Sequence, residues 1–289
     1  MTAIIGIVVV LAAVLGGYAM ESGNFHVLFQ PAEFLIIFGA AIGSLILSSP
    51  SKVFKAIIKD IGHVFTDSKL NKGYYIRLLL LLNAVYAKIK KEGLIAIEAD
   101  VENYEKSALF QKHSDIMGDR DVAEFICDTI RVMITANYPP HEMENLMDID
   151  LEINNHERMV PSHSINKMGD ALPGLGIVAA VLGVVLTMGM ITEPPEVLGH
   201  HIGAALVGTF LGVLTCYGFV GPIATNLEHK ANERAAYMNV IKTSLMAAYS
   251  TDFMIHFAIE SGRRAIPGED RPSFLEVEDA LKKWKATKS

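Results

Sequence analysis

The sequence predicts an all-α integral membrane protein, in which four transmembrane helices form two hairpins and a helical domain lies in the cytoplasm. The first observation is the composition, because 51% of the residues are hydrophobic while 20% are charged. The second is that Asp, Glu, Lys and Arg are absent from four long apolar runs, at residues 4–20, 34–47, 172–191 and 202–223. About 20 residues of helix cross the hydrocarbon core of a bilayer, so runs of this kind are typical of spanning helices.

The first two runs predict the first hairpin. Run 4–20 lacks the basic start and the cleavage site of a signal peptide, so we interpret it as a span. Run 34–47 is short and reaches spanning length only with its flanks, from Glu33 to Pro50.

Basic residues set the expected orientation. The turns at 21–31 and 192–201 contain no Lys or Arg, whereas the opposite ends of the runs are flanked by Lys52, Lys55, Lys59, Lys167, Lys230 and Arg234. The positive-inside rule therefore places both turns outside and both termini in the cytoplasm. The predicted organisation is a hairpin (1–50), a cytoplasmic helical domain (51–169), a second, channel-forming hairpin (170–224) and a cytoplasmic helical tail (225–289).

Helix signals predict the cytoplasmic elements. One helix is expected over 75–92, ending near Gly93, and another over 119–136. Pro140 is expected to begin a further helix that Pro161 ends, because proline suits the first turn and disrupts the interior. Beyond Pro222, nothing interrupts the helical pattern until about residue 248.

Small residues recur at every fourth position of the spans. The fourth run carries the longest such ladder, Ala204, Gly208 and Gly212, and the third run carries Gly176 and Ala180. This spacing lets helix backbones approach closely in lipid. Packing inside one four-helix unit explains a single pair, and the longer ladder indicates contact with a neighbouring subunit or a partner helix.

The four runs offer no acidic side chain. Proton transport through a bilayer normally needs a titratable group within it, so a proton channel built from this chain would take its carboxylate from a second protein. Thr209 and Tyr217 are among the remaining polar groups, and they either bond to their own helix or line a narrow path. Pro173 is expected in the first turn of the third span, and Pro222 near the inner end of the fourth. Both prolines fit ordinary helix starts or kinks, or a hinge.

Several other functions are excluded. The formal net charge of −7 gives no electrostatic signal for nucleic acid. The two cysteines match no metal or disulfide spacing. Residues 174–179 match a loose dinucleotide fingerprint inside an apolar run, and Asn145 breaks a zinc-protease pattern at His141. We predict no enzyme activity, no metal and no cofactor.

Three stretches resemble signatures of the MotA family. They are GDALPGLGIVAAVLGVV at 169–185, VGTFLG with YGFVGP over 207–222, and RPSFLEVE at 271–278. The resemblance implies a stator of the bacterial flagellar motor in the inner membrane. A homo-oligomeric ring, a pentamer, surrounds a MotB dimer whose transmembrane helix supplies the ion-binding aspartate, and the ring drives the rotor protein FliG.

The resemblance also implies roles for particular residues. Pro173 and Pro222 match the functional prolines of the family, and Ala180, Thr209 and Tyr217 match its ion pathway. Rotor contact is assigned to Lys90, Glu98 and Asp150. At Lys90 the family usually has arginine, so the charge is kept while the planar fork of the guanidinium is lost.

The transported ion and two alternatives complete the predictions. Sodium-type relatives carry threonine at the place of Ala180, and alanine cannot coordinate a hard cation, so we predict protons. An ExbB/TolQ-like channel subunit that energises outer-membrane transport is the first alternative, although such proteins usually have three spans. A passive membrane scaffold is the second.

Overall fold

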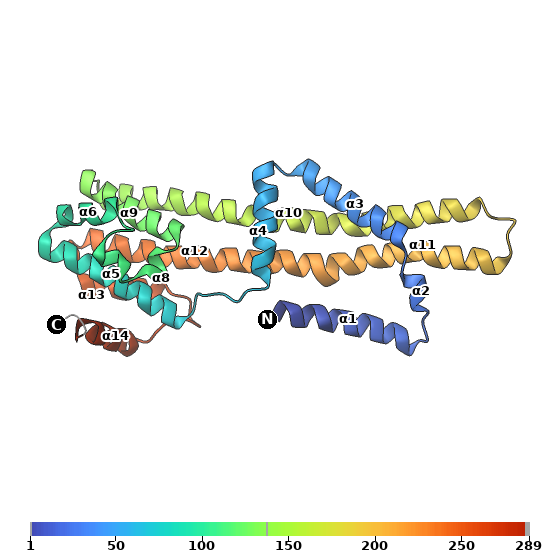
Figure 1. Cartoon of the computed structure of the whole chain (residues 1–289). Coiled ribbons are helices and arrows are strands. Elements are labelled where there is room, and N and C mark those ends of the chain that lie inside the picture. The colour runs from blue at the N-terminus through green and yellow to red at the C-terminus, as the bar shows by residue number, and fades with distance from the viewer. Residues whose placement is uncertain (1, 137, 287–289) are drawn as a thin grey trace. The chain divides into compact units, whose positions relative to one another are not determined.

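The computed structural model describes residues 2–136 and 138–286, and every regular element in these ranges is a helix (Figure 1). The predicted all-α fold class is therefore confirmed. The helices are α1 (Thr2–Met20), α2 (Phe25–Leu28), α3 (Pro31–Ser48), α4 (Ser51–Val64), α5 (Lys72–Glu92), η1 (Leu94–Ile97), α6 (Glu98–Glu102), α7 (Ala108–Gln111), α8 (Ser114–Met117), α9 (Arg120–Thr135), α10 (Pro140–Met188), α11 (Pro195–Thr215), η2 (Cys216–Val220), α12 (Gly221–Ser250), α13 (Ile255–Ala265) and α14 (Phe274–Ala286).

Four helical stretches are long and apolar enough to cross a membrane, as predicted. They are Thr2–Met20, Phe25–Ser48, Pro140–Met188 and Pro195–Ser250. The chain also divides into two compact units. The span unit comprises Met1–Asp67 and Glu157–Ala231, and the polar unit comprises Ser68–His156 and Asn232–Ser289.

In the span unit, α4 runs across the neighbouring helices (Figure 1). Its sequence is strongly amphipathic, and it buries Ile57 and Val64 in a cluster that includes Leu45. The ammonium group of Lys230 donates to the carbonyl oxygens of His63 and Thr66, at the carboxyl end of this helix. A cation at this end satisfies free carbonyl groups and complements the helix dipole.

The polar unit is built around α5, whose apolar side chains are almost all buried. They pack in one core with side chains from α9, α12 and α13. As predicted, α5 ends at Gly93, which has a φ of 91° that favours glycine. Asp119 caps the start of α9 and also accepts a hydrogen bond from Arg234 at 2.6 Å. These contacts join segments far apart in the sequence into one core.

Two predictions about prolines are wrong. Helix α10 continues through Pro161 to Met188, so Pro161 does not end it and Pro173 lies inside it rather than in a first turn. An interior proline removes one hydrogen bond and costs about 3 kcal/mol. Packing offsets part of this cost, because the buried Ser162 hydroxyl donates to the Ala224 carbonyl oxygen at 2.8 Å and ties α10 to α12 next to Pro161.

The predicted long helix beyond Pro222 is confirmed by α12, and the structure adds a π-helical turn, η2, immediately before it. In this turn the Gly221 N–H donates to the Cys216 carbonyl oxygen. Pro222 cannot donate a backbone hydrogen bond, and in a regular helix its ring would press on the carbonyl of Gly218. A single widened turn relieves such a clash, and turns of this kind are frequent at functional sites.

The prediction that the spans hold no acidic side chain is also wrong. Helix α3 begins at Pro31, which suits a first helical position, and this start brings Glu33 into the span. Glu33 is only 8% exposed. Glu33 stands just before the apolar run 34–47, in the flank that brings this run to spanning length.

Candidate functional site

The second hairpin packs backbone against backbone. A Cβ atom built on Gly176 would lie 2.7 Å from the Gly208 carbonyl oxygen, and one built on Gly212 would lie 2.5 Å from the Leu172 carbonyl oxygen. Real Cβ atoms do not approach so closely, so α10 and α11 meet at a distance that only glycine allows. The ladder predicted from small-residue spacing thus packs, at Gly208 and Gly212, within one chain.

Three of the predicted ion-path residues lie along this hairpin. The Cα atom of Thr209 would be 3.2 Å from a Cβ atom on Gly176. Pro173 and Ala180 lie one helical turn to either side of Gly176 on α10, because three- and four-residue steps return to the same face. Pro173, Ala180 and Thr209 are all half-buried. The structure thus places Thr209 opposite the stretch of α10 that runs from Pro173 to Ala180.

The other two predicted ion-path residues lie at the π-helical turn. Tyr217 is within η2 and is 71% exposed, and Pro222 is exposed in the first turn of α12. A large aromatic ring in this position is available for contact with another chain or with lipid. The π-turn was not predicted, although Pro222 is the signal that could have indicated it.

The three predicted rotor-contact residues belong to the polar unit. Lys90 lies in the last turn of α5, Glu98 begins α6, and Asp150 lies in α10; all three are exposed. Glu98 and Asp150 form no ion pair within residues 2–136 and 138–286. Their charges are therefore open to a partner.

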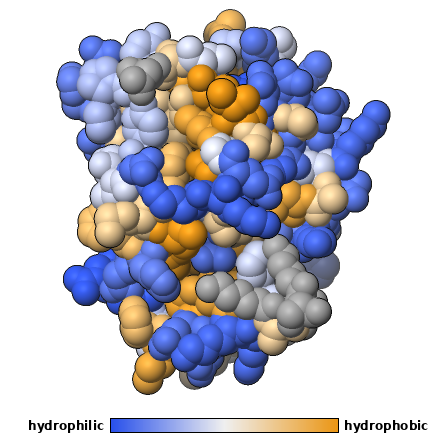
Figure 2. Space-filling view, turned by 90° about the vertical axis from the view of Figure 1, so that its left-hand side faces the viewer, coloured by the Kyte–Doolittle hydropathy of each residue, from blue (hydrophilic) through white to orange (hydrophobic). Residues whose placement is uncertain are grey.

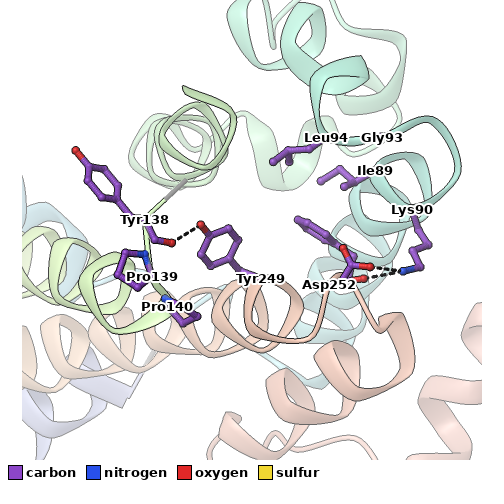
Figure 3. Close-up of a pocket in the computed structure, with 10 residues that line it drawn as sticks. Ile89, Lys90, Gly93, Leu94, Tyr138, Pro139, Pro140, Tyr249 and Asp252 are labelled. Carbon is purple, nitrogen blue, oxygen red and sulfur yellow. Dashed lines mark hydrogen bonds and ion pairs between the residues drawn. The ribbon is translucent and has the colours of Figure 1, made fainter. Parts of the chain in front are cut away.

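Lys90 instead bonds inside the chain (Figure 3). Its ammonium group donates to the Asp252 carbonyl oxygen at 2.8 Å and to the Asp252 Oδ2 atom at 3.0 Å. The side chains of Lys90 and Asp252 are 51% and 94% exposed. Ion pairs with such exposure contribute about 0–1 kcal/mol, so an outside carboxylate could displace Asp252 at little cost.

Asp252 stands in a strained turn that the sequence did not reveal. Asp252 and Phe253 have φ angles of 50° and 57°, in the left-handed region that side chains other than glycine disfavour. Phe253 is anchored in the core, where its ring centroid lies 6.2 Å from that of Tyr86. Burial raises the pKa of the Tyr86 hydroxyl, which donates to the Ser244 hydroxyl oxygen at 2.9 Å. The buried ring thus holds the turn while Asp252 stays at the surface.

A cavity of about 690 Å³ adjoins Lys90 (Figure 3). On the side of the cavity away from Lys90, the Tyr249 hydroxyl donates to the Tyr138 carbonyl oxygen at 2.6 Å. The cavity is lined by a mixture of apolar and charged residues, which are Ile89, Lys90, Gly93, Leu94, Tyr138, Pro139, Pro140, Tyr249, Asp252 and Phe253. An apolar and aromatic lining with exposed charged groups at its edge is the arrangement found in protein contact sites.

The surface at this end of the polar unit is mixed. Figure 2 shows hydrophilic side chains around the edge of the face and a broken band of hydrophobic side chains between them. Large apolar side chains of the polar unit that stand more than half exposed are Ile95, Ile149, Ile153, Met254, Phe257, Phe274 and Leu275. A polar rim around scattered apolar groups suits contact with another protein.

Comparison with known proteins gives two family matches. Residues 4–93 match the motility protein A N-terminal model, and residues 119–240 match the model of the MotA/TolQ/ExbB proton channel family. Motility protein A of Escherichia coli (strain K12) is 39% identical over 282 residues, covering 98% of this chain and 95% of the relative. Chemotaxis protein LafT of Vibrio parahaemolyticus is 33% identical over 98% of this chain and 97% of its own length.

Solved structures share the fold. The structure of C. jejuni MotAB gives a TM-score of 0.75 at 20% identity and covers 94% of this chain and 98% of the other. The flagellar MotAB stator complex from Bacillus subtilis gives 0.72 at 23% identity with the same coverage. Four spanning helices and the match over 119–240 define a multi-pass membrane protein of the proton-channel class. The sequence identity to these relatives, which extends along nearly the whole length of this chain, shows that the chain belongs to the motility protein A family.

Proposed function

We propose that this chain is the flagellar stator subunit that forms a proton channel with MotB and converts ion flow into torque on the rotor protein FliG. The observation that carries the proposal is the 39% identity to a motility protein A over 98% of the chain. The glycine-packed pair of α10 and α11 supports it, because a tight helix pair provides a firm wall for a channel. Proteins of this family are channel subunits and not enzymes.

MotB is the proposed channel partner. The related solved complexes carry the name MotAB, and large apolar side chains such as Val185 and Leu206 remain exposed on α10 and α11. Lipid or other helices must cover such surfaces. A ring of five copies around a MotB dimer would cover part of them. The basic residues that flank the spans support an orientation in the bacterial inner membrane with both termini and the polar unit in the cytoplasm.

The proposed mechanism begins at the MotB aspartate. Protonation removes its charge beside the wall formed by α10 and α11, near Pro173 and Thr209. The charged and neutral forms prefer different packings of that wall, so each proton shifts the balance between two arrangements. Pro173 and Pro222, with the π-turn at η2, are the points at which the helices of the channel wall bend. Ala180 leaves no hydroxyl there for a sodium ion, which supports protons as the transported ion.

Rotor contact is proposed for the exposed charges of the polar unit. Lys90, Glu98 and Asp150 offer both signs to a partner. Complementary charges set partner choice and encounter rate even when they add little affinity. In this proposal Lys90 exchanges Asp252 for an acidic group of FliG, and the cavity beside it receives a neighbouring apolar side chain.

Gene deletion tests the function directly. Deletion should leave assembled but paralysed flagella, and the wild-type gene should restore swimming, as seen by microscopy. Cells that swim normally without a second stator gene, yet fail to take up iron complexes, would instead support the ExbB/TolQ-like alternative.

Charge reversal at Glu98 is expected to weaken torque. Glu98→Lys places a positive charge where the rotor presents one, and like charges across a contact cost up to several kcal/mol. A compensating reversal on FliG should restore the speed of tethered cells. Glu105→Lys is the matched control, because Glu105 is also an exposed glutamate of the polar unit. If no FliG reversal restores the Glu98 variant, electrostatic coupling at this residue is wrong.

Asp252→Asn is expected to lengthen the time for which a stator unit stays engaged with the rotor. Asparagine tolerates the left-handed backbone and keeps the carbonyl that Lys90 bonds, but it removes the competing negative charge. One exposed charge pair is worth about 1 kcal/mol, so the dwell time at the motor should rise by up to about fivefold. Stepwise speed changes of a bead on a flagellum measure this time. Asp279→Asn makes the same change of charge at another exposed site, and an equal effect there would contradict the exchange.

A further inference from the structure

Glu33 is a carboxyl group enclosed within the span unit. It occupies the first turn of α3 and is only 8% exposed, and its Oε2 atom is buried without a hydrogen-bond partner. A carboxylate in such a place is costly, because charged groups inside a membrane protein normally pair with another charge or with backbone groups. An intramembrane ionisable residue of this kind is a candidate for function.

Two glycines make room for this carboxyl group. A Cβ atom on Gly208 of α11 would lie 2.5 Å from Glu33 Oε2, and one on Gly183 of α10 would lie 3.6 Å from Oε1. Ala205 of α11 lies directly against Gly183, with its Cβ atom 2.6 Å from a Cβ atom built on Gly183. We call Gly183, Ala205 and Gly208 the carboxyl seat.

The seat contains no opposite charge. Its three residues carry no titratable side chain, and no ion pair in the described part of the chain involves Glu33. An ionised Glu33 would therefore be an uncompensated buried charge, which destabilises a protein by several kcal/mol. A neutral, protonated carboxyl avoids this cost and still fills the space that the glycines leave.

We propose that Glu33 is a proton-binding group of the stator in addition to the partner's aspartate, and that its protonated form, held in the carboxyl seat, positions α3 against the α10–α11 pair. The inference rests on the proposed channel function. Its role is to position the channel wall, since Gly208, which makes room for its Oε2 atom, lies on the face of α11 that packs on α10. With the hairpin turns outside, the seat exchanges protons with the outer side of the membrane.

Infrared spectroscopy tests the protonation directly. The complex with MotB is reconstituted in lipid at neutral pH, and the spectrum of the Glu33→Gln variant is subtracted from that of the wild type. The MotB aspartate is present in both samples and cancels. We expect the carbonyl stretch of a protonated carboxyl group, shifting in heavy water. A difference that contains only carboxylate bands would overturn the proposal.

Swimming tests the positioning role. Glu33→Gln is neutral and of the same shape, so it should swim within about twofold of the wild type. Glu33→Ala empties the seat and should lose most of its speed at equal membrane levels. Ala32→Gly, at the neighbouring position of α3, is a control for truncation in this turn. Full speed in Glu33→Ala, or paralysis in Glu33→Gln, would overturn the positioning role.

The two proposals fail differently. Carboxylate bands from a complex that still powers swimming would reject the role of Glu33 and leave the stator function intact. A protonated carboxyl band in a protein whose deletion leaves swimming unchanged would reject the stator function while the carboxyl seat stands.

Discussion

Replacing Gly176 by valine is expected to abolish swimming. At this position α10 touches the backbone of α11, since an added Cβ atom would lie 2.7 Å from the Gly208 carbonyl oxygen and 3.2 Å from the Cα atoms of Thr209 and Gly212. Backbone atoms cannot rotate away as a side chain can. Overpacking in ordinary cores costs about 1–3 kcal/mol, and a helix pair that must separate loses its other contacts as well.

Swimming speed and the amount of protein in the membrane measure this effect. Gly199→Val is the matched control, because Gly199 is on the same hairpin and an added Cβ atom there meets nothing within 4 Å. The control variant should accumulate and swim nearly as the wild type does. Normal swimming by Gly176→Val would show that the two helices do not pack at this point in the working stator.

Replacing Pro173 by alanine is expected to remove torque while the protein still reaches the membrane. Pro173 lies inside α10, where it leaves the carbonyl of Gly169 without its usual partner. Alanine restores that hydrogen bond and stiffens α10 next to Thr209. A stiffer helix in the channel wall should pass on less of the conformational change that protonation causes. Flagella should therefore assemble but remain paralysed or turn at less than about a tenth of normal speed. Such a loss corresponds to an effect of at least about 1.4 kcal/mol on the coupling step.

Pro161→Ala provides the comparison. It makes the same chemical change in the same helix, outside the apolar run. Torque from tethered cells and membrane levels should both stay close to those of the wild type. If the two variants behave alike, the flexibility that proline gives to α10 is not specific to the channel wall, and a scaffold role gains support.

Much of the fold followed from the sequence because its causes are local. Lipid offers no hydrogen bonds, so apolar runs of sufficient length must be helical, and the four predicted spans agree with the structure. Gly93 ends α5 as expected, and α9 begins where a helix was predicted, with Asp119 capping its first turn. Two of the three family motifs also lie in the spans, where the identity of each residue depends on close packing.

The errors arose where distant residues meet. Pro161 and Pro173 were expected at helix ends, yet contacts such as that of Ser162 with Ala224 hold α10 together. The pairing of Lys90 with Asp252 joins residues 162 positions apart. The left-handed turn at Asp252 contains no glycine from which it could have been predicted. These features depend on which surfaces pack, and local propensity does not determine that.

The sequence by itself determined the four spans, the orientation expected from charge, and the membership in a channel family. Only the tertiary structure decided that Glu33 is enclosed by Gly183 and Gly208, that α10 and α11 meet at their backbones, and that Lys90 already has a partner. The physical reason is the range of the interactions. Hydrophobicity and backbone preference act along the chain, whereas burial, ion pairing and close approach act between elements that the chain brings together only after it folds.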